Sequence, residues 1–166
     1  MKTIVNKLLA DELLSMAEID QAMRFLAIKD ENAWNAQIDE DNSTRLQTIV
    51  EAQGWPTISK VGTNASHAAW LLVQHAPSLD FMKNCLELMK QLPKDEVNPA
   101  NVAYLEDRVL MMSGEPQIYG TQFQGKGKDL QVYPISEPEK VEERRASVGL
   151  GTFAENEARV RELYGG

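Results

Sequence analysis

The sequence predicts a compact, mainly α-helical domain that carries one small β-hairpin. Apolar residues recur every three or four positions through most of the chain, which is the spacing of amphipathic helices. Prolines, glycines and capping side chains separate these segments, as expected at helix ends. Only one pair of short runs, on either side of a glycine-rich turn, has the character of strands. A chain of 166 residues can bury a core without disulfides.

Four predicted helices occupy the N-terminal half of the chain. They cover residues 3–29, 42–53, 64–75 and 79–92. Asp41 or Asn42 is the expected cap of the second helix, after a polar stretch with room for one helical turn around Trp34. A glycine or a proline ends each of the last three, and Ser78 is the expected cap of the fourth.

The C-terminal half adds three predicted helices and the two strands. The helices cover residues 99–113, 138–149 and 153–164, and the strands cover residues 117–123 and 130–135. Asn98 followed by Pro99 is a typical helix start. Thr152 and Glu155 have the spacing of a capping box. Residues 125–129 supply the turn between the strands.

We expect residues 1–166 to form a single domain with three parts. These are an N-terminal helix with a polar linker, a core and a C-terminal helix, at residues 1–40, 41–150 and 151–166. No internal repeat and no low-complexity linker separates them.

The composition argues against several classes of function. A formal charge of −8 disfavours binding along the phosphate backbone of nucleic acids, which requires a cationic surface. No apolar run approaches the length of a membrane-spanning helix, and the first nine residues are unlike a signal peptide. The single cysteine excludes an internal disulfide framework. We therefore expect a cytoplasmic protein that binds neither nucleic acid nor membrane, and its oligomeric state stays open.

Two histidines and a glutamine lie on the most apolar predicted helix, residues 64–75. A buried polar group costs about 1–3 kcal/mol unless it is paired, so these side chains either bond to the protein or form a ligand site. His75 is a candidate proton carrier and Gln74 a candidate for binding a substrate carbonyl or amide. Alternatively, both residues bond the free carbonyls at the helix end. His67 is a candidate substrate-binding residue or a surface residue.

The second group of polar residues lies on the fifth predicted helix and the first predicted strand. Arg108 could hold a carboxylate or phosphate with two hydrogen bonds, while Asp107 could orient a histidine. Tyr119 is a further candidate catalytic residue, and Thr121 and Gln122 are candidates for positioning the substrate. A solvent-exposed helix face and strand edge would explain the same residues without any site.

Known catalytic motifs and metal sites are not apparent. The chain has no nucleophile elbow, phosphate-binding loop, dinucleotide fingerprint or His-Glu-x-x-His motif. His67 and His75 are not spaced as a helical metal-ligand pair, so we expect neither a metal nor another cofactor. Cys85 lies on the apolar face of its helix, which predicts an inert core thiol.

Several sequence blocks resemble those of a group of bacterial proteins known only as a domain of unknown function. The blocks are Gly-Trp-Pro at 54–56, Ala-Ala-Trp-Leu-Leu-Val-Gln-His-Ala at 68–76, Tyr-Leu-Glu-Asp-Arg-Val at 104–109, Gln-Ile-Tyr-Gly-Thr-Gln at 117–122 and the segment 134–150. The resemblance covers residues 41–150 and implies no particular activity. Pro77 departs from it, because the resemblance leads us to expect an acidic residue there.

Three functional hypotheses remain open. In the first, the protein is a hydrolase or group-transfer enzyme for a small anionic or amide-containing substrate, with His75 as general acid or base, oriented by Asp107. In the second, it is a non-enzymatic module that binds a small molecule or a protein partner, as an immunity-type or regulatory protein does. In the third, both groups of polar residues are structural.

Overall fold

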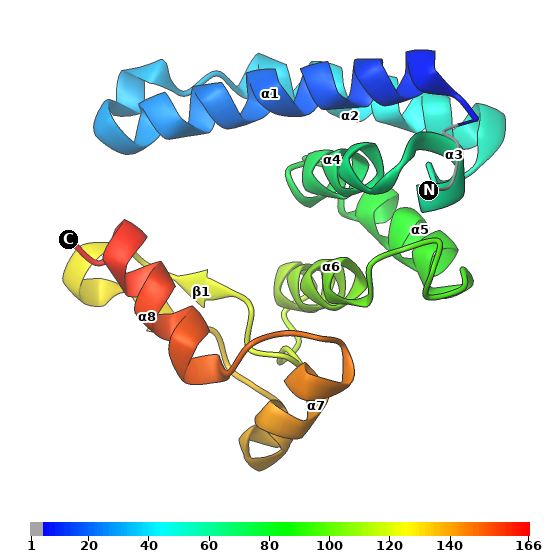
Figure 1. The fold of residues 1–166 in the computed structure, drawn as a ribbon. Helices are drawn as coiled ribbons and strands as arrows, with labels where there is room; N and C mark the ends of the chain where they lie inside the picture. Colours follow the sequence, from blue (N-terminus) through cyan, green and yellow to red (C-terminus); the bar gives the residue numbers. More distant parts are fainter. Residues whose placement is uncertain (1–4) are drawn as a thin grey trace. The chain divides into compact units, whose positions relative to one another are not determined.

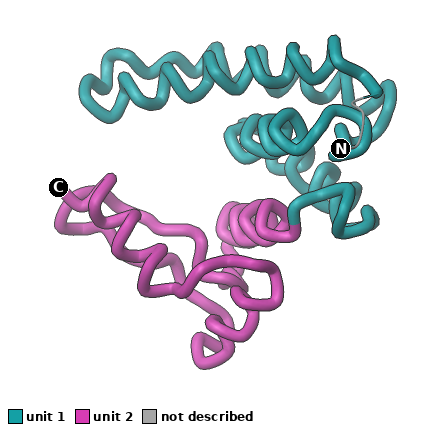
Figure 2. Tube along the Cα trace, in the orientation of Figure 1, with its two compact units in different colours: residues 1–98 teal, residues 99–166 magenta. Residues whose placement is uncertain are grey.

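The computed structural model describes residues 5–166, which form eight α-helices, three short 3₁₀-helices and one two-stranded antiparallel sheet (Figure 1). The predicted class, mainly α with one small hairpin, is confirmed. The chain divides into two compact units, Met1–Asn98 and Pro99–Gly166 (Figure 2).

The first unit consists of five α-helices and one 3₁₀-helix. In chain order they are α1 (Lys7–Lys29), η1 (Glu31–Ala33), α2 (Ala36–Gln53), α3 (Ile58–Val61), α4 (Thr63–Gln74) and α5 (Leu79–Lys90). α1 and α2 run side by side as a long hairpin, and α4 packs against both (Figure 1). The core of the unit includes the fully buried side chains of Leu13, Leu46, Val61, Leu72, Val73, Met82 and Met89.

Side-chain caps determine where three of these helices begin. The side chains of Asn6, Asn35 and Ser78 each accept a hydrogen bond from a backbone N–H in the first turn of α1, α2 and α5. The prediction for Ser78 is thereby confirmed. The predicted first helix included residues 3 and 4, which lie outside the described residues, and α1 itself begins at Lys7.

The predicted start of α2 at Asp41 or Asn42 is wrong. The helix begins at Ala36 because Asn35 caps it, so Asp41 lies inside the helix and accepts a hydrogen bond from Gln37 instead. Several polar residues follow Asn35 before the first buried apolar residue of α2. The apolar periodicity therefore becomes visible more than a turn after the helix has begun.

The second unit places a small sheet among three α-helices. Its elements are α6 (Pro99–Met112), β1 (Phe123–Gln124), η2 (Gly127–Asp129), β2 (Gln131–Val132), η3 (Pro138–Lys140), α7 (Val141–Ser147) and α8 (Phe153–Tyr164). In the sheet, Phe123 pairs with Val132 and Gln124 pairs with Gln131. The predicted capping box of Thr152 and Glu155 at the start of α8 is confirmed.

The predicted strand over residues 117–123 is largely wrong. Only its last residue, Phe123, belongs to β1, while Gln117 forms an isolated parallel bridge with Ile135. The backbone between them instead bonds to buried side chains, as described below. Of the helices in residues 5–166, none has the length and apolarity needed to cross a membrane.

Candidate functional site

His75 lies at the C-terminal end of α4, at the edge of the core of the first unit. Eight of the twelve residues of α4 are buried, which fixes this helix between its neighbours. His75 is the capping residue after the last turn, and its side chain retains 18% of its exposure. The imidazole is therefore held by packed structure and still reached by solvent.

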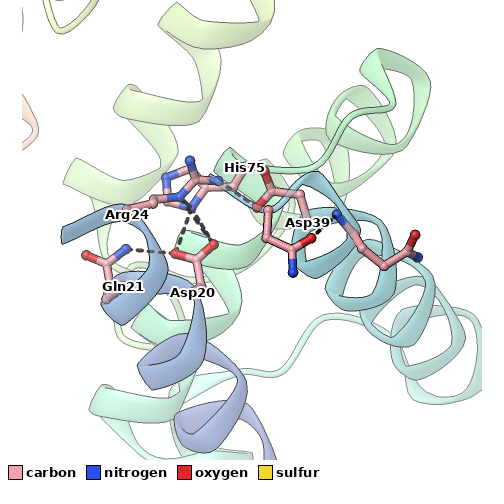
Figure 3. Close-up of polar contacts among 7 residues, drawn as sticks. Asp20, Gln21, Arg24, Asp39 and His75 are labelled. Atoms are coloured by element: carbon pink, nitrogen blue, oxygen red, sulfur yellow. Dashed lines mark hydrogen bonds and ion pairs between the residues drawn. The ribbon is translucent and has the colours of Figure 1, made fainter. Parts of the chain in front are cut away.

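Asp20 on α1 is the carboxylate that holds this imidazole. Nδ1 of His75 lies 3.0 Å from both carboxylate oxygens of Asp20, which is fully buried (Figure 3). Gln21 Nε2 donates to Asp20 Oδ2 at 2.8 Å, and Arg24 Nε lies 3.3 Å from Oδ1. A fixed carboxylate at Nδ1 orients an imidazole for proton transfer at Nε2.

Two groups compete for Nδ1 of His75, because Arg24 Nε lies only 2.9 Å from it. If Nδ1 carries the proton, it donates to Asp20, and the N–H of Arg24 Nε is left with Asp20 Oδ1 at 3.3 Å. If Nδ1 is unprotonated, it accepts from Arg24 Nε, but its lone pair also faces two carboxylate oxygens at 3.0 Å, which is repulsive. We therefore assign the Nδ1–H tautomer to the neutral ring. Nε2 is then an acceptor, and no residue of the described chain forms a hydrogen bond with it.

The pKa of Asp20 lies below its ordinary value. Burial is the largest single influence and acts to raise this pKa, but the hydrogen bonds and charges of His75, Gln21 and Arg24 together outweigh it. Asp20 is therefore ionised at neutral pH and provides a fixed negative charge beside the imidazole.

Arg24 connects this pair to α2. Its Nη2 atom lies 2.6 Å from Asp39 Oδ1, and its guanidinium carbon lies 4.8 Å from the centre of the Trp34 ring. We call Asp20, Arg24, Asp39 and His75 the His75 cluster. Two carboxylates and one guanidinium give it a net charge of −1 while the imidazole is neutral.

The other polar residues predicted on α4 have different surroundings. Gln74 is only 6% exposed, and its Oε1 atom accepts no hydrogen bond from any described residue. His67 is exposed, and its ring contacts that of Trp70 with 4.8 Å between ring centres. Since His67 lies two helical turns from His75, we leave it out of the His75 site.

In the second unit, Asp107 on α6 uses both carboxylate oxygens to hold the loop 117–122. Oδ1 accepts from the backbone N–H groups of Ile118 at 2.7 Å and Tyr119 at 3.0 Å. Oδ2 accepts from the backbone N–H of Thr121 at 3.0 Å and from its hydroxyl at 2.9 Å. Burial raises the pKa of Asp107, and these four bonds oppose the shift.

Other buried polar side chains also hold this loop. Arg145, which is 2% exposed, donates from Nη1 to the carbonyl of Tyr119 at 2.8 Å. Gln117, which is fully buried, donates to the carbonyl of Gln122 at 2.9 Å and accepts from its N–H at 2.8 Å. These side chains replace the strand pairing that the sequence predicted for the loop.

Three more predicted site residues extend this network. Arg108 Nη1 donates to Gln122 Oε1 at 3.3 Å, and Gln122 Nε2 donates to Thr121 Oγ1 at 3.1 Å. Thr121 and Gln122 are buried, so their side chains support the loop from within.

Tyr119 is half-buried on the same loop. Burial is the main cause that raises the pKa of its hydroxyl, and the charges of Glu106 and Asp107 add to it against the opposing charge of Arg144. The phenol therefore stays protonated at neutral pH and can donate a hydrogen bond to a ligand.

Asp107 was the residue predicted to orient His75. In the structure Asp20 occupies that place, and the carboxylate of Asp107 holds the 117–122 loop. That Asp107, Arg108 and Tyr119 take part in catalysis or substrate binding stays a prediction.

The thiol of Cys85 is fully buried, and burial raises its pKa to about 12, which agrees with the predicted inert core thiol. Within residues 5–166, no three His, Cys, Asp or Glu side chains are grouped as metal ligands.

Sequence reasoning missed Asp20, Arg24 and Asp39. The signal for Asp20 was its place on the buried stripe of α1, because it follows Ala17 by three residues and precedes Met23 by three. A carboxylate on such a stripe requires a partner. No comparable signal marks Asp39, which becomes part of the cluster only through the pairing of α1 with α2.

This chain belongs to a family of unknown function, DUF6624, whose model matches residues 7–166. The match includes α1 and α8, which lie outside the 41–150 segment covered by the resemblance of sequence blocks. No curated protein and no solved structure matches the chain.

Proposed function

We propose that this protein is a hydrolase or group-transfer enzyme in which His75 transfers a proton to or from a small substrate. The observation that carries the proposal is the buried Asp20 carboxylate, 3.0 Å from Nδ1, combined with an Nε2 atom that no described residue bonds. A neutral imidazole held in this way can accept a proton from a water or hydroxyl nucleophile and return it to the leaving group.

The neighbouring groups have supporting roles in this proposal. Asp20 keeps the ring in the Nδ1–H tautomer and stabilises the imidazolium that forms when Nε2 takes up a proton. Gln21 and Arg24 hold Asp20, so they are positioning residues. Because these contacts exist before substrate arrives, little reorganisation is needed during the reaction.

An amide or ester suits this site better than an anion. The His75 cluster is negatively charged while the imidazole is neutral, and this charge repels an anionic group.

The test is a panel of 4-nitrophenyl esters and amino-acyl 4-nitroanilides. For any substrate that is turned over, His75→Ala should lower kcat by at least about 100-fold and Asp20→Asn by about 10- to 100-fold. Arg45→Ala is the control, because Arg45 is exposed on α2 and pairs only with Glu12 among the ion pairs described. A folded His75→Ala variant with unchanged activity would refute the proposal.

A binding module is the second candidate, and the 117–122 loop favours it. Buried side chains bond both N–H and C=O groups of this loop, while the side chains of Ile118 and Tyr119 remain half-exposed. A preformed loop of this kind loses little entropy when a partner binds. This candidate predicts a stable complex without turnover, which Tyr119→Ala weakens and His75→Ala leaves intact.

A further inference from the structure

Two unused hydrogen-bonding atoms of the His75 cluster are acceptors. Nε2 of His75 is unprotonated in the assigned tautomer, and Asp39 bonds Arg24 through Oδ1 only, which leaves Oδ2 available. A ligand that bonds these two atoms must therefore supply hydrogen-bond donors.

The charge of the cluster selects the same kind of ligand. The side chains of Asp20 and Asp39 retain only 1% and 12% of their exposure, so water screens their charges weakly. With Arg24 as the one cation, the net charge is −1 in the state in which His75 acts as a base. This state attracts a cation and repels an anion.

An aromatic ring beside the carboxylates adds to this preference. Trp34 already lies against the guanidinium of Arg24, yet its side chain remains half-exposed. The faces of indole rings attract ammonium and guanidinium groups. Carboxylates, the neutral acceptor Nε2 of His75 and an aromatic surface are therefore all linked through Arg24 and Asp20.

We infer that the ligand of the His75 cluster carries a cationic nitrogen group, either an ammonium or a guanidinium, which is bound beside Asp39. The inference rests on the proposed function and specifies its substrate as a small amide or ester with a positively charged nitrogen group. The cation binds the carboxylate of Asp39, and the amide or ester lies at Nε2 of His75.

The experiment uses the full-length protein, whose two histidines give a simple spectrum. Histidine ring nitrogens labelled with ¹⁵N are followed by NMR during titration with butylammonium, methylguanidinium or butyrate at constant ionic strength. We expect both cations to shift the His75 resonances in a saturable way and butyrate to leave them unchanged. The resonances of His67 report non-specific effects.

Variants of α2 identify the carboxylate responsible. Asp39→Asn should weaken binding of both cations about tenfold, which corresponds to the loss of one partly buried charge pair. Asp39→Glu should restore binding, since it keeps the charge. Asp41→Asn is the matched control, because Asp41 is exposed on the same helix and bonds Gln37.

Three results would overturn the inference: no saturable shift with either cation, stronger binding of butyrate, or unchanged affinity in Asp39→Asn. The proposed function is tested separately, by the activity of His75→Ala. If His75→Ala loses activity but neither cation gives a saturable shift, the proposed function stands and only the cationic class of ligand is overturned. Retained activity would overturn the role of His75 whatever the titration shows.

Discussion

Asp20 is a buried charge whose cost is offset by its neighbours. Among the described residues, its hydrogen-bond partners are all donors, and they come from its own helix and from the end of α4. An ionised carboxylate without such partners would shift its pKa upward or destabilise the fold. The same contacts that make Asp20 tolerable in the core also orient His75, so stability and the proposed catalysis depend on one group.

Asp20→Asn should therefore lower the free energy of unfolding by about 1.5–3 kcal/mol at pH 7, because charged hydrogen bonds are lost. The folded-state pKa of Asp20 is lowered, so folded protein binds this proton less tightly than unfolded protein does. The stability that ionised Asp20 contributes is fully present above its pKa in the unfolded protein, about 4. It is lost as the pH falls through the pKa of Asp20 in the folded protein. Urea unfolding from pH 7 downward should show the difference between wild type and variant shrinking below about pH 4.

Asp11→Asn is the control, since Asp11 is an exposed residue on the same helix that pairs with Lys7. Its effect should stay below about 0.5 kcal/mol at every pH. A difference between wild type and Asp20→Asn that grows toward acid pH would contradict the assigned direction of the pKa shift.

The 117–122 loop shows how side chains can replace regular secondary structure. Asp107 binds its N–H groups, Arg145 binds a carbonyl, and Gln117 pairs with both backbone groups of Gln122. The alternation of residue types favours a strand, but the loop turns at Gly120, where φ is +67°. At this turn Gly120 lies against the ring of Phe153, more than thirty residues away in the sequence, with no room for a Cβ.

Gly120→Ala should destabilise the protein more than Gly114→Ala. Both glycines have positive φ, which costs an L-residue about 1–2 kcal/mol. A Cβ at Gly120 would lie 2.8 Å from the Phe153 ring, whereas a Cβ at Gly114 would meet nothing within 4 Å. We expect the clash to add about 1–3 kcal/mol, measured by urea unfolding. Equal effects of the two substitutions would show that Phe153 does not constrain the loop.

Asp107→Asn should lower the unfolding free energy by about 2–4 kcal/mol, because one carbonyl oxygen cannot accept all the bonds that two carboxylate oxygens accept. Amide hydrogen exchange at Ile118, Tyr119 and Thr121 should accelerate. Glu115→Gln serves as the control, because Glu115 is exposed just before the loop. Unchanged exchange in Asp107→Asn would refute its role in holding the loop.

The sequence predicted those elements whose signals are local. Helix caps such as Ser78 and Thr152, like apolar stripes, can be recognised from a few neighbouring residues. The sequence therefore predicted α5, α8 and the overall helical class. His75 was selected because it interrupts an apolar helix. Identifying Asp20 as the partner of His75 requires knowing which helices pack together, because the two residues lie 55 positions apart. Contacts of this kind are set by tertiary structure, which periodicity does not encode.

At the scale of the whole molecule, length and composition led to the prediction of one domain, which stays a prediction, and the chain divides into two compact units. The boundary falls between Asn98 and Pro99, in a helix start that has no glycine-rich or low-complexity linker to mark it. The His75 cluster lies wholly in the first unit, and the network around the 117–122 loop lies wholly in the second. Each can therefore be tested within its own unit.

The fragment Met1–Asn98 should fold without the rest of the chain. It contains α1 to α5 and the buried residues between them, including Leu13, Leu46 and Leu72. We expect a helical circular dichroism spectrum and a single cooperative urea transition. Asp20→Asn should destabilise the fragment and the full chain by the same amount within about 0.5 kcal/mol, because every partner of Asp20 is present in both. A fragment that unfolds without cooperativity, or a clearly different effect of the substitution, would show that the first unit depends on residues beyond Asn98.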